Sequence, residues 1–96
     1  MQNLQNLISI MKETRALLAL ERNDFSWSSW EDQDQAISEI DLIVTELENG
    51  SVPDIGALFA PTGPIQEVSI SSGWGEEFIE LAQRFDHEYE RVRNQT

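Results

Sequence analysis

Apolar residues recur every three or four positions along three stretches of the chain, and this spacing predicts three helices. The expected helices cover about residues 2–22, 30–50 and 72–93. A repeat of 3.6 residues places apolar side chains on one side of a helix, where they can pack against a shared core. Arg15 interrupts the apolar side of the first helix. We therefore expect its stem at the edge of the core and its guanidinium on a carboxylate.

The second predicted helix has signals at both ends. Ser28 or Ser29 is expected to cap its start, and Glu31, three residues after Ser28, can complete a capping box. Asn49-Gly50 supplies residues that tolerate the left-handed backbone conformation at a helix end. The apolar side of this helix is formed by Trp30, Ala36, Ile37, Ile40, Ile43, Val44 and Leu47.

The segment between the second and third helices has a different pattern, which predicts a β-hairpin. Residues 55–60 and 65–70 are expected to be strands, joined by turn residues from Pro61 to Pro64. In the second strand, Val68 and Ile70 would face the core. A two-stranded hairpin is marginal alone, so it would lie on the helices or pair with another chain, which makes a homodimer plausible. The predicted fold is α+β: two antiparallel helices, a β-hairpin and a long C-terminal helix in one domain, residues 1–96.

The charge of the chain is strongly acidic and unevenly distributed. It carries 6 basic and 18 acidic residues, for a formal net charge of −12, and no base lies between Asn23 and Gln83. Such a surface repels nucleic-acid phosphates and anionic lipid, so neither nucleic acid nor membrane is expected as a partner. A partner attracted by charge would be basic. The alternative is that the acidity only keeps a small protein soluble.

Three acids of the second helix recur at intervals of seven residues and predict an acidic ridge beside its apolar side. They are Asp32, Glu39 and Glu46, and Leu42 lies next to them. None has a Lys or Arg three or four residues away on the same helix. One interpretation is a solvated ridge, partly neutralised by Lys12 or Arg84 from neighbouring helices. The other is a partner-binding edge with Leu42 as its apolar anchor.

Aromatic residues cluster at the junction of the first two helices. Phe25, Trp27 and Trp30 fall within six residues, and Trp74 opens the third helix. Together they could bind a small ligand such as a sugar, or a peptide, by stacking. The alternative is a cap that seals the open end of the helical pair.

The residues needed for common catalytic and metal chemistry are scarce. The chain has no cysteine, and its one histidine, His87, is expected on the polar face of the last helix. This excludes a thiol nucleophile and a His-rich zinc site. The glycines lack the spacing of a phosphate-binding loop, and Asp32-Gln-Asp34 lacks the rest of a calcium loop. We expect no cofactor, no metal and no enzymatic activity.

Without a visible secretory signal or a membrane span, the expected location is the cytoplasm.

These observations favour a small acidic module that docks a basic partner protein, as toxin-neutralising (immunity-like) or nucleic-acid-mimicking inhibitors do. The acidic ridge is its expected binding surface. A small-molecule or sugar-binding domain that uses the aromatic cluster is the alternative. A structural subunit is a third possibility.

Overall fold

The computed structural model describes residues 4–21, 23–26, 30–59 and 63–93. Within these ranges the chain forms four α-helices and one short 3-10 helix, η1. In order they are α1 (Gln5–Leu18), α2 (Gln33–Glu48), η1 (Gly56–Phe59), α3 (Pro64–Ser72) and α4 (Gly75–Arg93). The same ranges contain no β-strand. The predicted α+β fold with its β-hairpin is therefore wrong, and the domain is all-helical. The argument for a homodimer paired through strand edges does not apply to it.

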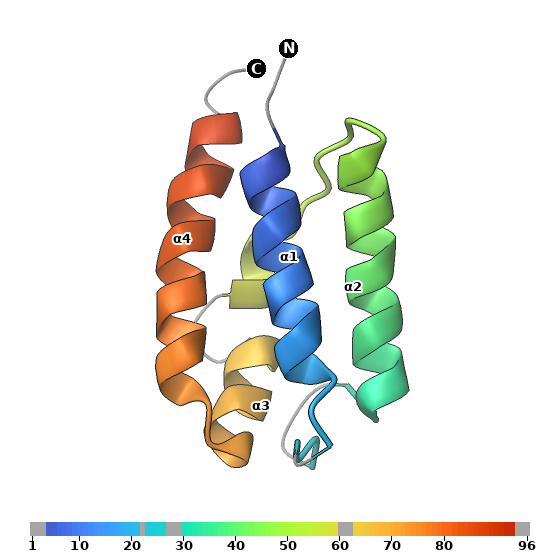
Figure 1. Ribbon diagram of the computed structural model, residues 1–96, viewed down its shortest axis with the longest axis vertical. Coiled ribbons are helices and arrows are strands. Elements are labelled where there is room, and N and C mark those ends of the chain that lie inside the picture. The colour runs from blue at the N-terminus through green and yellow to red at the C-terminus, as the bar shows by residue number, and fades with distance from the viewer. Residues whose placement is uncertain (1–3, 22, 27–29, 60–62, 94–96) are drawn as a thin grey trace.

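The three long helices lie side by side, with α1 in the middle (Figure 1). α2 packs against one flank of α1, and α4 packs against the other. η1 and α3 both pack against α4. The three helices predicted from apolar spacing are thus confirmed as α1, α2 and α4, although α1 ends at Leu18 and α2 begins at Gln33.

The core is formed by the predicted apolar sides of these helices. From α2 it buries Ala36, Ile40, Ile43 and Leu47. Full burial of a side chain such as Ile or Leu contributes about 1.5–3 kcal/mol. This contribution explains why the long amphipathic segments fix the arrangement of the helices. From α4 the core buries Phe78, Leu81, Phe85, Tyr89 and Val92.

The segment before and within η1 is held against α4 by aromatic packing and by one tyrosine hydroxyl. The ring of Phe59 stacks on Phe85 with centroids 4.4 Å apart, and Phe85 stacks on Tyr89 at 5.0 Å. The Tyr89 hydroxyl accepts a hydrogen bond from the Ile55 amide at 3.3 Å and donates one to the Pro53 carbonyl at 3.5 Å. Residues 53–59 are thereby fixed opposite α2.

Residues 64–72 form helix α3 where a strand is predicted. The helix buries Ile65, Val68 and Ser69, whereas Ile70 is 68% exposed. Pro64 occupies the first helical turn, where its missing N–H costs nothing. Gly73 ends the helix with φ 86°, and the amides of Gly73 and Trp74 both donate to the Ser69 carbonyl at 3.0 Å. The proline and glycine that bound this segment are thus helix-boundary residues.

The start of α2 also differs from the prediction. Asp32 is its N-cap, and its carboxylate accepts a hydrogen bond from the Gln35 amide at 2.9 Å. A carboxylate at this position satisfies a free helix amide and lies at the positive end of the helix dipole. Ser28 and Ser29, the predicted caps, lie outside the described residues.

Candidate protein-docking groove

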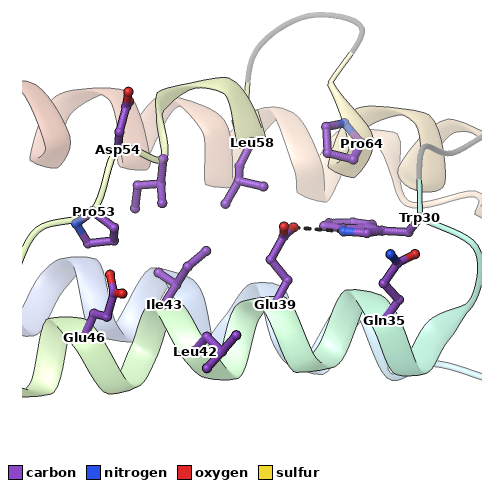
Figure 2. Close-up of a pocket in the computed structure, with 11 residues that line it drawn as sticks. Trp30, Gln35, Glu39, Leu42, Ile43, Glu46, Pro53, Asp54, Leu58 and Pro64 are labelled. Atoms are coloured by element: carbon purple, nitrogen blue, oxygen red, sulfur yellow. Dashed lines mark hydrogen bonds between the residues drawn. The ribbon is translucent and has the colours of Figure 1, made fainter.

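A groove of about 540 Å³ runs between α2 and the segment that follows it (Figure 2). We call it the α2 groove. One wall is a single face of α2, formed by Gln35, Glu39, Leu42, Ile43 and Glu46. Each of these residues lies three or four positions from another of them, so they form one face of the helix. From Gln35 to Glu46 the wall spans three helical turns, or about 16 Å.

The opposite wall is formed by Pro53, Asp54, Ile55, Leu58 and Pro64. Ile55 is 5% exposed and joins the core, while Leu58 is half-buried and packs at its edge. The Asp54 side chain is exposed. Because the Tyr89 hydroxyl fixes the backbone at both Pro53 and Ile55, this wall is built before any ligand binds.

Trp30 forms the end of the groove nearest the start of α2. Its indole N–H donates a hydrogen bond to Oε2 of Glu39 at 2.8 Å (Figure 2). The residue as a whole is only 5% exposed. The bond restricts the rotamer of Glu39 and holds its carboxylate in the groove, with the other oxygen free of any described partner.

Three of the four residues predicted to bind a partner line the groove together: Glu39, Leu42 and Glu46. Leu42 is 69% exposed, and two other large apolar side chains of the described helices are also exposed, Ile70 at 68% and Ile79 at 56%. The fourth, Asp32, lies at the N-terminus of α2, where it caps the helix, and is not a lining residue. The ridge predicted from seven-residue spacing therefore corresponds to a groove wall over its last two acids.

Two bases of the described part of α1 contact the other flank of α2. Nε of Arg15 lies 2.6 Å from Oδ1 of Asp41, and Nζ of Lys12 lies 3.9 Å from Oε2 of Glu48. The hydrogen bond to Asp41 raises the pKa of Arg15. The prediction that Arg15 reaches a carboxylate is thus confirmed.

The prediction that Lys12 or Arg84 neutralises the ridge is wrong for the described residues. Lys12 contacts Glu48, and Arg84 forms two hydrogen bonds with Glu13, at 2.6 and 2.9 Å. The Arg84 side chain lowers the pKa of Glu13 through these bonds and, to a smaller extent, through its charge. Among the groove-lining residues of the described chain there is no Lys, Arg or His.

The predicted aromatic cluster is divided between the core and the groove. Trp74 is fully buried, and its indole N–H donates to Oδ1 of Asn23 at 2.8 Å. Trp74 thus has no exposed ring on which a ligand could stack. Phe25 is half-buried against the core, and Trp27 lies outside the described residues. A small-ligand site built from Phe25, Trp27, Trp30 and Trp74 stays a prediction.

Other kinds of site find little support in the described part of the chain. No group of three or more His, Cys, Asp or Glu side chains is close enough there to hold a metal ion. His87 is exposed on α4, as predicted, beside Arg84 and Glu88. Among the helices described, none combines the length and apolarity required to cross a bilayer.

Sequence reasoning missed the second wall of the groove and the role of Trp30. Pro53, Asp54 and Leu58 follow the end of α2 and meet it again only through tertiary packing. Their position depends on Tyr89, which lies 34 residues after Ile55. No local spacing carries that information.

Comparisons with protein-family models, with curated proteins and with solved structures found no match to this chain. The α2 groove, whose two walls carry both apolar and acidic residues, is therefore the basis on which a function is inferred.

Proposed function

We propose that this protein is a non-enzymatic binding module that docks a basic segment of a partner protein in the α2 groove. The observation that supports this most directly is the composition of the groove. Leu42, Ile43 and Leu58 provide apolar surface, while Glu39, Glu46 and Asp54 provide carboxylates, and no Lys, Arg or His is among the described lining residues. A segment that carries both apolar and cationic side chains complements such a groove.

The two kinds of residue would contribute differently to binding. Burial of apolar surface contributes about 25 cal/mol per Å², so Leu42, Ile43 and Leu58 would supply most of the affinity. An exposed ion pair is worth only about 0–1 kcal/mol. The carboxylates would instead speed association and exclude acidic partners. A standard interface covers about 800 Å² on each partner, so the groove would be the centre of a larger contact.

The experiment is capture of partners on immobilised protein from a lysate of the source cells at low and high salt, followed by titration of the purified partner. The test variant is Glu39→Lys with Glu46→Lys. Its matched control is Asp86→Lys with Glu90→Lys, which makes the same change in net charge on exposed positions of α4. We expect one basic protein to bind wild type and control, to dissociate at high salt, and to bind the test variant at least about tenfold more weakly.

A second variant separates lost charge from local damage. Glu39→Lys removes the acceptor for the Trp30 indole, whereas Glu46→Lys with Asp54→Lys leaves that hydrogen bond in place. Both double variants should weaken binding. Equal binding by wild type and both groove variants, or no captured protein at all, would contradict the proposed function.

A further inference from the structure

The two flanks of α2 are covered to different extents by the described chain. Along one flank α2 packs against another long helix, α1. On the other flank the neighbours are residues 53–58, which include part of the four-residue η1, and Pro64 at the start of α3. The groove therefore occupies the place beside α2 where a helical bundle would hold a further helix.

The exposed wall of α2 has the spacing that one helix presents to another. Gln35, Glu39, Leu42 and Glu46 are at positions i, i+4, i+7 and i+11. Spacings that alternate between four and three residues form the seam along which a second helix packs. A helix that matched all three turns of the wall would contribute about eleven residues.

Backbone hydrogen bonding favours a helical occupant over an extended one. An extended peptide gains affinity mainly by adding a strand to a sheet edge, and the described residues contain no strand. In this groove its amides and carbonyls would face Leu42, Ile43 and Leu58, where unpaired polar groups are costly. A helix pairs these groups internally and offers only side chains. Recognition of a polyproline segment needs an aromatic-lined groove, but the one lining aromatic residue here, Trp30, is 5% exposed.

The spacing of the two acids on this wall determines the spacing of the basic residues that a partner helix would need. Glu39 and Glu46 are seven residues apart, a rise of about 10.5 Å along α2. Two bases separated by seven residues lie on one face of a helix with the same spacing. Apolar residues three and four positions after the first base would then lie near Leu42, which is 69% exposed between the two acids.

We infer that the occupant of the α2 groove is a basic amphipathic α-helix of about three turns. It carries Lys or Arg at positions i and i+7 and apolar residues at i+3 and i+4. This inference rests on the proposed function, because it specifies the partner that the same groove takes. The inference is more specific than the proposed function, since a basic partner could also bind the groove through a segment that is not helical.

The test is selection from a displayed library of random peptides of about twelve residues, the length that fills the groove as a helix. Full-length protein is the bait, and the Glu39→Lys/Glu46→Lys variant removes peptides that bind elsewhere. We expect the selected peptides to carry paired bases seven apart and to lack proline. Isolated helices of this length are marginal in water, so circular dichroism should show that the peptides gain helix on binding.

A matched peptide pair sharpens the measurement. One peptide is the best selected sequence, and its control has a central residue replaced by proline, which breaks a helix. The control should bind at least about tenfold more weakly, because an interior proline costs a helix about 3 kcal/mol.

The outcomes separate the two proposals. Selected basic peptides that bind without helix, or equally well with proline, would overturn the helical occupant and leave the proposed function standing. Selected peptides without bases, or no enrichment over the variant, would overturn both.

Discussion

The two flanks of α2 carry similar acids but meet different surroundings. On the flank against α1, Asp41 contacts Arg15 and Glu48 contacts Lys12. On the groove flank, Glu39 accepts a bond from Trp30, and Glu46 has no ion-pair partner in the described chain. Lys12, Arg15 and Arg84 thus join helices to one another, whereas no Lys or Arg is among the described residues that line the groove.

Two residues of the groove flank, Leu42 and Glu46, contribute little to the stability of the fold. Glu46 lies in the last turn of α2, at the negative end of the helix dipole, and no basic residue shares that turn. Leu42 exposes an apolar side chain to solvent between two carboxylates. Features that oppose stability persist in natural proteins where activity uses them. A need for solubility alone would explain the acids, but it gives no reason for the apolar residues that line the groove between them.

The largest effect we expect is a difference in stability between alanine variants on the buried face and on the groove face of α2. Ile40→Ala should destabilise the protein by about 3 kcal/mol, because Ile40 is fully buried and its truncation leaves a cavity. Leu42→Ala should change the free energy of unfolding by less than about 0.5 kcal/mol, since the side chain is mostly exposed. Urea denaturation of both variants measures the difference. A loss for Leu42→Ala close to that of Ile40→Ala would show that Leu42 serves the fold.

The Glu88 carboxylate on α4, which pairs with Arg91, should make a smaller contribution to stability, and this contribution should depend on pH. Glu88 is 8% exposed, and it accepts hydrogen bonds from Arg91 at 3.1 and 3.2 Å and from Asn6 at 2.7 Å. Hydrogen bonding by Arg91 and then by Asn6 lowers the pKa of Glu88 from its ordinary value of 4.5. A lowered pKa stabilises the folded state above the ordinary value, and this contribution is lost as pH falls through the lowered pKa.

The variant that tests this contribution is Glu88→Gln. It should cost about 1 kcal/mol at pH 7, because the amide is a weaker partner for Arg91. The difference from wild type should shrink as the pH falls below 4.5. Urea denaturation at pH 7 and at about pH 3 measures it, the latter chosen to lie below that ordinary pKa. A cost that does not change with pH would mean that the charge of Glu88 does not matter for stability.

The sequence predicted long elements better than short ones. Apolar spacing found α1, α2 and α4 because each repeats its pattern over several turns. Residues 64–72 are too short for such a repeat. Ile65 and Val68 fit a helix, while Val68 and Ile70 fit a strand equally well. Pro64 and Gly73 decide between the two, since proline at the first turn and glycine at the end are typical of a helix.

The candidate site was predictable only where it lies on one helix. The spacing of Glu39, Leu42 and Glu46 places them on one face of α2, and all three line the groove. The opposite wall depends on hydrogen bonds between Tyr89 and the backbone of Pro53 and Ile55, which are more than 30 residues away in sequence. Local patterns contain no information about such a contact.

The smallest effect we expect is on stability. Removing one negative charge should stabilise the protein on the groove flank of α2 and destabilise it on the flank against α1. Glu46→Gln should stabilise the protein by a few tenths of a kcal/mol, because it removes a negative charge from the last turn of the helix. Asp41→Asn removes the same charge but also the ion pair with Arg15, so it should lower the urea midpoint. Each variant raises the net charge by one, and the general self-repulsion of the chain is thus relieved equally in both. Two shifts in the same direction would mean that the net charge, and not the local partner, determines what an acid on α2 does.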